Sequence, residues 1–263
     1  MKKFIDSIIA TIKKAFSKPT NQVEEVQDPI IVPEELVTIA PLETPIVKEL
    51  TLVEKLIILA KKKDYAVFED NSKDFNLNIW FIRSEDPTPD TFNDKCVVFW
   101  KNLKGSWEQK QFTVTTDPGL YWMTKRDYHS VAILAEGQYR GTHKIDIHRA
   151  GTKSAHKALC QRLGVVKVYR DGNKDKIHDF DVPTQTGTFG INCHQPSIYS
   201  EQNGIVHSSS AGCLVFSKRK DFDNPTNSFD KNTFMGLMEL SAKEWVNRFS
   251  ITLCTELELN QIN

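Results

Sequence analysis

Two short segments of the chain place a histidine and a cysteine in a setting suited to thiol chemistry. Residues 190–195 read Gly-Ile-Asn-Cys-His-Gln, and residues 208–216 read Ser-Ser-Ser-Ala-Gly-Cys-Leu-Val-Phe. A cysteine sulfur is a strong nucleophile only as the thiolate, and a neighbouring imidazole can accept the thiol proton. We therefore expect Cys213 to be the nucleophile and His194 to be its general base.

The three residues that precede this cysteine are small, so a substrate carbonyl can come close to the backbone there. Ser210, Ala211 and Gly212 leave room for backbone N–H groups to reach a substrate carbonyl. Such N–H groups stabilise the oxyanion that forms when a nucleophile attacks the carbonyl carbon. We expect these three residues to support catalysis without taking part in covalent chemistry.

The histidine segment, residues 188–194, reads as a β-strand. Successive side chains of a strand point to opposite faces, so Asn192 and His194 share one side. The other side carries Cys193 together with Phe189 and Ile191, and we expect that face to be buried. Asn192 is then a predicted neighbour of the base, and Cys193 a predicted core residue.

Other histidines offer alternatives to this assignment. His207 is nearer to Cys213 in the sequence and can serve as the base instead. His143, Asp146 and His148 lie close together, but their spacing matches no familiar metallopeptidase motif. We expect surface or structural roles for these three residues, and we predict neither a metal site nor a cofactor.

The cysteine pattern argues against a disulfide framework. The chain has five cysteines, an odd number, with no CxxC pair and no zinc-binding spacing. Reduced thiols are the simplest interpretation, which fits synthesis in a reducing cytosol. Apart from Cys213, we expect most of the cysteines to pack as small buried hydrophobic residues, among those at positions 96, 160, 193 and 254.

Composition and charge exclude several classes of protein. The 34 Lys and Arg residues balance 34 Asp and Glu residues, so net charge gives no reason to expect a nucleic-acid partner. No segment approaches the roughly 20 apolar residues that a membrane-spanning helix needs. The N-terminus begins like a signal peptide, but Asp6, Lys13 and Lys14 interrupt its apolar region. We therefore do not expect a secretory signal.

The chain divides into three predicted parts. Residues 1–17 have the spacing of an amphipathic helix, which can lie on an anionic membrane surface, dock on a partner or pack on its own domain. Residues 18–50 are rich in proline and acidic residues, which favours an extended linker. Residues 51–255 form the predicted catalytic domain, because apolar segments with regular spacing are found there.

The predicted domain is mainly β with peripheral helices. Thr51 and Glu54 have the spacing of a capping box, which predicts a helix that ends in the lysine run at 61–63. A late helix is predicted over 233–248. Between them the predicted strands are short, at 77–82, 95–100, 110–115, 130–134, 164–169 and 188–194. With no repeats and no alternation of strands and helices, we expect a mixed, mainly antiparallel sheet structure.

The order and spacing of these residues resemble the L,D-transpeptidase (YkuD-type) catalytic domain. The signature of that family is a histidine, a variable stretch and then Ser/Thr-His-Gly-Cys. Eighteen residues separate His194 from Cys213 here, and Ser210 and Gly212 match the second block. The resemblance covers about residues 130–222. Two positions depart from the family pattern, since the second histidine is Ala211 and the usual arginine or asparagine after the cysteine is Val215.

The resemblance implies a fold and a mechanism. The fold would be the sandwich- or barrel-like domain of that family. Cys213 would attack a carbonyl between an L-centre and a D-centre of a peptidoglycan stem peptide, with His194 moving the proton. The N–H groups of Gly212 and Cys213 would stabilise the oxyanion. The thioester would pass to an amine, as in a transpeptidase, or to water, as in a hydrolytic L,D-peptidase.

The implied substrate lies at the bacterial cell envelope, outside the cytoplasmic membrane. Without an export signal, this location fits a phage or prophage product that stays in the cytoplasm until lysis, like an endolysin, or is carried on a virion. Two other functions remain open. One is a non-catalytic peptidoglycan-binding or virion structural module that keeps the fold, favoured by Ala211 and Val215. The other is a thiol peptidase of unrelated fold with His207 as base.

Overall fold

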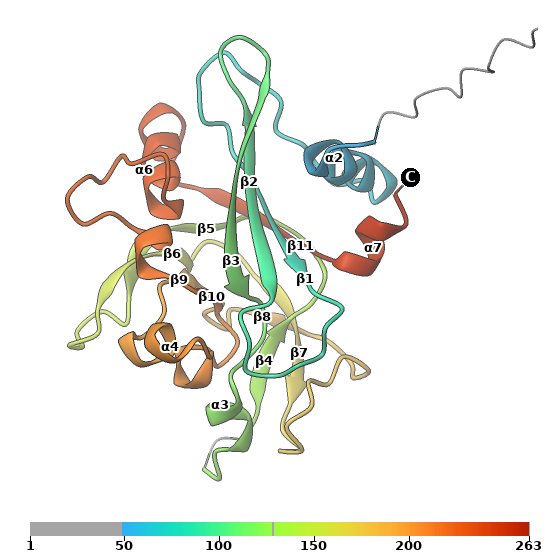
Figure 1. Cartoon of the computed structure of the whole chain (residues 1–263), viewed down its shortest axis with the longest axis vertical. Helices are drawn as coiled ribbons and strands as arrows, with labels where there is room; N and C mark the ends of the chain where they lie inside the picture. The colour runs from blue at the N-terminus through green and yellow to red at the C-terminus, as the bar shows by residue number, and fades with distance from the viewer. Residues whose placement is uncertain (1–48, 128, 263) are drawn as a thin grey trace, which may run out of the picture. The chain divides into compact units, whose positions relative to one another are not determined.

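The computed structural model describes residues 49–127 and 129–262 of the chain (Figure 1). The predicted helix at 1–17 and nearly all of the predicted linker at 18–50 lie outside the described residues, so both stay predictions. Within the described part, no helix has the length and apolar character needed to cross a bilayer.

The described part begins with a helix whose start is set by its capping residue. In α2 (Leu52–Lys62), Glu54 N–H donates to Thr51 Oγ1 at 3.3 Å, and Thr51 N–H donates to Glu54 Oε2 at 2.7 Å. These reciprocal bonds form the predicted capping box. The apolar face of α2 packs on the outside of the sheet, in a cluster that includes Trp80, Val97 and Phe99.

Eight strands close into a barrel in the order β1-β11-β5-β6-β9-β10-β3-β2. Most neighbouring strands are antiparallel, but β1 and β11 are parallel, as are β9 and β10. The strand bounds are β1 Asn78–Arg83, β2 Asp94–Lys101, β3 Trp107–Thr115, β5 Gly137–His148, β6 His156–Gln161, β9 Cys193–His194, β10 Leu214–Phe216 and β11 Phe249–Thr255.

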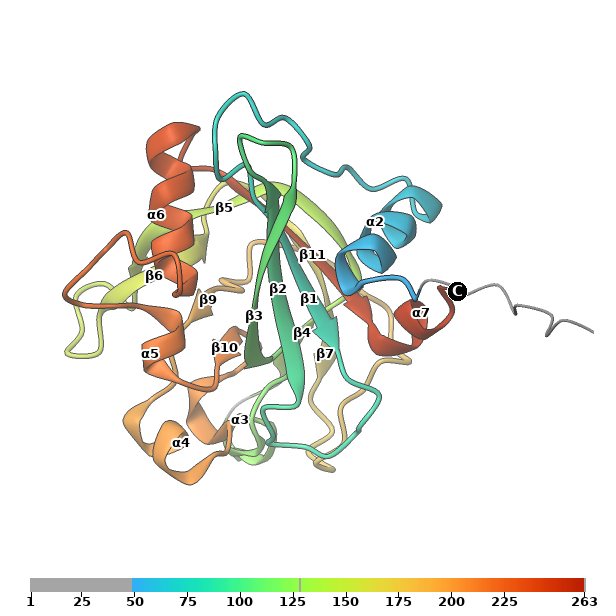
Figure 2. The same ribbon diagram turned by 45° about the horizontal axis from the view of Figure 1, so that its top comes forward.

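A smaller sheet and several short helices surround the barrel. The sheet has the order β4-β7-β8, with bounds Val131–Leu134, Val166–Asp171 and Gln185–Gly187. Figure 2 shows α2 and α7 on one side of the barrel and α6 on the other, with α3, α4 and α5 near one end. The remaining helices are α3 Leu120–Thr124, α4 Ile198–Asn203, the 3₁₀ helix η1 His207–Ser209, α5 Arg219–Phe222, α6 Phe234–Glu244 and α7 Glu256–Asn260.

Strand β1 shows how the barrel is stabilised on both of its faces. All six residues of β1 are buried. Ile79 and Phe81 belong to the main core inside the barrel, whereas Trp80 and Ile82 pack outside it with α2. Successive side chains of β1 point alternately into the barrel and towards α2, and both sides are buried. The centre of the strand is therefore apolar at every position.

The structure confirms a mainly β protein with few helices, and it shows that the sheet closes into a mixed barrel. The first five predicted strands overlap β1, β2, β3, β4 and β7, and the predicted late helix overlaps α6. The predicted strand at 188–194 is largely wrong, because only Cys193 and His194 pair, as β9. Strands β5, β6, β8, β10 and β11 had no counterpart among the predicted ones.

Candidate functional site

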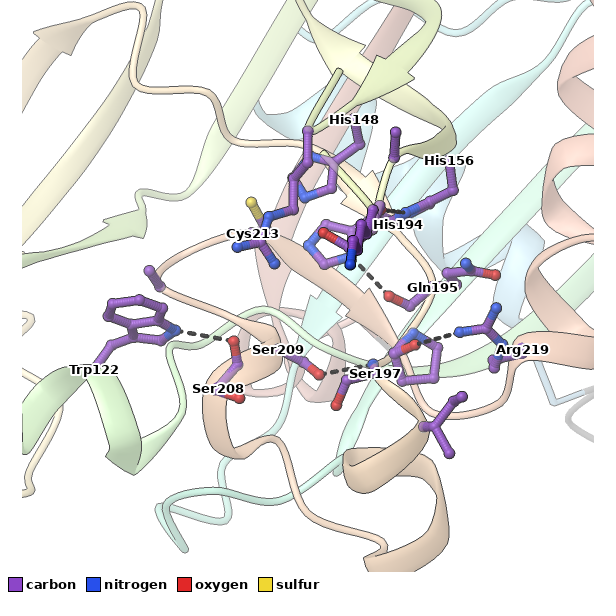
Figure 3. Close-up of a pocket in the computed structure, with 17 residues that line it drawn as sticks. Trp122, His148, His156, His194, Gln195, Ser197, Ser208, Ser209, Cys213 and Arg219 are labelled. Carbon is purple, nitrogen blue, oxygen red and sulfur yellow. Dashed lines mark hydrogen bonds between the residues drawn. The ribbon is translucent and has the colours of Figure 1, made fainter. Parts of the chain in front are cut away.

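His194 and Cys213 are placed by neighbouring parallel strands of the barrel. His194 is the last residue of β9, and Cys213 directly precedes β10, which pairs Val215 with His194. Both side chains line an open pocket of about 550 Å³. Figure 3 shows Cys213 and His194 together on one wall, with Trp122 and Arg219 towards opposite ends. The fold thus brings the two predicted reactive residues to the same pocket.

The loop that leads into β9 is held by one glutamine side chain instead of strand pairing. Gln161 Oε1 accepts the backbone N–H groups of residues 189, 190 and 191 at 3.1, 2.9 and 3.1 Å. Gly190 has φ +73°, a conformation that glycine adopts readily. This geometry explains why no strand forms before Cys193, and it aims the Gly190 carbonyl at the pocket cysteine, whose thiol donates to it at 3.4 Å.

The turn that precedes Cys213 requires a glycine. Gly212 has φ +132°, and a Cβ at this position would lie 1.8 Å from the backbone oxygen of Ala132 in β4. Ser210 is buried and braces the turn, since its Oγ donates to the Cys213 carbonyl at 2.8 Å and accepts the Gly212 N–H at 3.0 Å. The Gly212 N–H is therefore engaged within the turn, and the Cys213 N–H is the predicted oxyanion donor that remains.

The imidazole of His194 is held in the tautomer that a general base needs. Its Nδ1 lies 2.7 Å from the backbone oxygen of Gln195. A carbonyl oxygen can only accept, so Nδ1 carries the proton and Nε2 keeps its lone pair. His194 is only 5% exposed, so its ring has little freedom to turn away.

A second imidazole, that of His148 at the end of β5, stacks on His194 with ring centroids 4.2 Å apart. The tautomer of His148 follows from Asn192. Asn192 Oδ1 accepts the Gln161 N–H at 2.9 Å, so its amide nitrogen donates to His148 Nδ1, also at 2.9 Å. His148 therefore carries its proton on Nε2. His156, which pairs with His148 across the β5–β6 hairpin, completes a cluster of three imidazoles.

This histidine cluster is not arranged as a metal centre. Across the described ranges, no group of three or more His, Cys, Asp and Glu side chains has a geometry that could hold a metal ion. Both His194 and His148 already use Nδ1 in hydrogen bonds to protein groups. The cluster instead places three imidazole rings against one another, with no hydrogen bond between them in the described part of the chain.

Burial keeps the reacting groups uncharged. Burial, followed by the neighbouring His148, holds the pKa of His194 well below its ordinary value. Burial also lowers the pKa of His148 to about 4. For the Cys213 thiol, burial raises the pKa, while the Asn192 backbone and the Arg149 charge act in the opposite direction. At neutral pH the pocket thus holds a thiol, which donates to the Gly190 carbonyl, and a neutral imidazole that can accept a proton.

His207, the alternative base, lies away from the pocket lining. Its ring sits beside Tyr121 and Tyr199, with centroids 5.2 and 4.8 Å away, and its backbone N–H donates to Asp90 Oδ1 at 2.7 Å. Ala211, in contrast, lines the pocket next to the cysteine. The geometry therefore favours His194 over His207 as the partner of the thiol.

The three residues at 143, 146 and 148, for which surface or structural roles are expected, take different positions in the structure. His143 is fully buried and bonds Thr142 Oγ1 and the Ile191 carbonyl, both at 2.8 Å, so its role is structural. Asp146 pairs with Arg162 at the surface. His148, however, lines the pocket.

Sequence reasoning also missed His156, Arg149 and Arg219, which line the same pocket. The available signal was the Gly151 turn between two histidines at 148 and 156. Reading that segment as a β-hairpin would have placed both imidazoles at one end of it, since paired residues of a hairpin lie side by side.

Comparisons with known proteins add no relative: no family model, no curated protein and no solved structure matches this chain.

Proposed function

We propose that this chain is a cysteine acyl-transfer enzyme in which Cys213 is the nucleophile and His194 the general base. The observation that carries the proposal is that a partly exposed cysteine and an imidazole of fixed tautomer line the same pocket. The other four cysteines are buried, and Cys213 alone among the five is partly exposed. Thiol catalysis requires a nucleophile that a substrate can reach and a base that can accept its proton, and these two residues are suited to those roles.

The reaction proceeds in two stages. Cys213 Sγ attacks the carbonyl carbon while its proton moves to His194 Nε2, and the Cys213 N–H donates to the oxyanion that forms. The intermediate collapses by breaking the C–N bond, and the leaving amine takes the proton from His194. The resulting thioester is then attacked by an amine or by water, whose proton His194 accepts before returning it to the thiolate.

The substrate we propose is a peptidoglycan stem peptide, cleaved between an L-centre and a D-centre. The support is the resemblance of the His194 and Cys213 segments to the L,D-transpeptidase signature, together with a positively charged pocket lining that suits a peptide bearing carboxylates. An amine acceptor makes the protein a transpeptidase, and water makes it a hydrolytic L,D-peptidase. The site of action would then be the bacterial cell envelope, reached at lysis or from a virion.

A covalent adduct at one cysteine tests this proposal. The full chain is incubated with muropeptides and, separately, with a carbapenem, and the intact mass is measured over time. We expect an adduct in the wild type that is absent in Cys213→Ala and retained in the control Cys254→Ala, which removes a buried cysteine. His194→Ala should slow adduct formation about 100-fold or more, the usual effect of removing a general base.

The remaining variants separate this function from its competitors. His207→Ala should form the adduct at the wild-type rate, and a melting curve of each variant checks that it is folded. An adduct that survives in His194→Ala and disappears in His207→Ala would reassign the base. A folded wild type that gives no adduct and no product would favour the non-catalytic peptidoglycan-binding or virion module.

A further inference from the structure

The pocket that holds Cys213 is lined by cations with no opposing acid. Arg149 and Lys153 come from the β5–β6 hairpin loop, and Arg219 begins α5. Among the described residues that line the pocket, none is an aspartate or a glutamate. The chain as a whole is neutral, so this concentration of positive charge is a local property of the pocket.

Within the described ranges, no ion pair joins the side chains of these three cations to a carboxylate, although the Arg219 backbone N–H donates to Glu201 Oε1 at 2.9 Å. Ion pairs elsewhere in the protein join Lys and Arg side chains to Asp and Glu, but none involves Arg149, Lys153 or Arg219. The guanidinium of Arg219 donates only to the Pro196 carbonyl, at 3.3 Å. Most of its donors are therefore available to a ligand.

Arg149 and Arg219 lie at different places along the pocket that contains Cys213. Arg149 directly follows His148, at the start of the β5–β6 loop, and its charge acts to lower the pKa of Cys213, His194 and His148. The charges of Arg219 and Arg149 both act to lower the pKa of His156. Figure 3 shows Arg219 beyond Gln195, on the side away from Cys213. A ligand that spans the pocket would meet Arg149, which follows His148 in the sequence, and Arg219 further along.

We propose that Arg149 and Arg219 recognise carboxylates of the acyl donor, so that the pocket selects peptides whose carboxylates are free over peptides in which they are amidated. This inference rests on the proposed acyl-transfer function. A guanidinium matches a carboxylate with two parallel hydrogen bonds, which gives orientation as well as affinity.

Binding to an inactive variant tests the proposal without requiring turnover. Two synthetic stem peptides are used that differ only in whether their carboxylates are free or amidated, and calorimetry measures their Kd for Cys213→Ala. We expect the free-acid peptide to bind about 100-fold more tightly, about tenfold for each arginine. Adding Arg149→Gln or Arg219→Gln should weaken free-acid binding about tenfold, the loss of one charge-assisted hydrogen bond, and leave amide binding within about twofold. Lys104→Gln, on the exposed β2–β3 turn, is the matched control and should change neither value.

The outcomes distinguish this proposal from the function on which it rests. Equal binding of the two peptides, no binding of the free-acid peptide, or an equal loss for both peptides in the arginine variants would overturn the carboxylate assignment. If the active chain still forms its Cys213 adduct in that case, acyl transfer stands without this selectivity. If no adduct forms but free-acid binding depends on Arg149, the pocket is a carboxylate-binding site and the acyl-transfer function fails.

Discussion

The cluster around Arg83 and the pocket around Cys213 both contain arginine, but they differ in whether the guanidinium is bonded to carboxylates. Arg83, in β1, is 5% exposed, and its guanidinium bonds Asp117, Glu136 and the Leu134 carbonyl at 3.0, 2.5 and 2.8 Å. Tyr169 in β7 then donates to the second oxygen of Glu136 at 2.8 Å. The Arg83 cluster thus joins the barrel to the smaller sheet with its charges matched.

The pocket around Cys213 contains polar groups that have no protein partner in the described part of the chain. Arg149 has no carboxylate partner among the described residues, and His156 Nε2 is buried without a hydrogen-bond partner there. Buried polar groups in stable proteins are almost always paired. The comparison separates a cluster whose arginine is bonded to carboxylates within the fold from a pocket whose arginines have no described carboxylate bonded to their guanidinium groups, which is where we propose that a ligand binds.

Two matched arginine substitutions give the largest effect and test this comparison directly. Arg83→Gln should lower the free energy of unfolding by about 3 kcal/mol, because it leaves the half-buried carboxylates of Asp117 and Glu136 without their cation. Arg149→Gln should change the free energy of unfolding by less than about 0.5 kcal/mol, as expected for an exposed side chain without a partner. Urea denaturation of both variants measures these values.

The function of the pocket should be affected by Arg149→Gln and not by Arg83→Gln, the reverse of their effects on stability. Per folded molecule, Arg83→Gln should keep the wild-type rate of Cys213 adduct formation, whereas Arg149→Gln should lose preference for free-acid peptides. A marked loss of stability in Arg149→Gln would mean that the guanidinium has a structural partner and would remove the distinction between the two clusters.

The sequence predicted the elements whose stability is local. The helix at α2 follows from Thr51 and Glu54, which are three residues apart, and β2 follows from a compact apolar run. Strand β5 carries Gly137 and Gly141 among polar residues, so its pattern is weak, and it is stabilised by pairing with β11 and β6. Barrel closure depends on such long-range pairs, which periodicity along the chain does not reveal.

The same limit explains which part of the site was predictable. His194 and Cys213 could be proposed because the types and order of their neighbours carry a chemical signature. The role of His148 could not, because it depends on β5 lying beside β6 and on the Asn192 amide that bonds its ring. Asn192 itself was proposed as a neighbour of the base, and the structure shows that it acts on the second imidazole.

Protonation of His148 in acid should change the free energy of unfolding by less than the substitution of Arg83 does. The pKa of His148 is about 4 in the folded chain, below its ordinary value of 6.5. As pH falls from 6.5 towards 4, the unfolded state binds the proton first, so stability is lost over that window. Between pH 7 and pH 4 the wild type should therefore lose about 2 kcal/mol more unfolding free energy than His148→Gln, allowing for partial exposure of the ring. Lys104→Gln should follow the wild-type curve, and parallel curves for wild type and His148→Gln would show that His148 titrates freely.

The smallest expected effect concerns the thiol itself. Arg149 opposes the rise that burial causes in the pKa of Cys213, so Arg149→Gln should raise that pKa further and reduce the thiolate fraction. At pH 7.5, iodoacetamide should then alkylate Cys213 about two- to fivefold more slowly, the size expected for one exposed charge interaction. Peptide mass spectrometry assigns the modified cysteine, and Lys104→Gln controls for loss of a distant positive charge. An unchanged rate would place the guanidinium beyond electrostatic reach of the sulfur, in which case Arg149 would contact only the part of a ligand remote from the scissile bond. If Arg149→Gln slows alkylation at low salt and high salt removes the difference from the wild type, the Arg149 charge acts on the sulfur through solvent. The ion pairs of Arg83 are shielded from solvent and should be much less sensitive to salt.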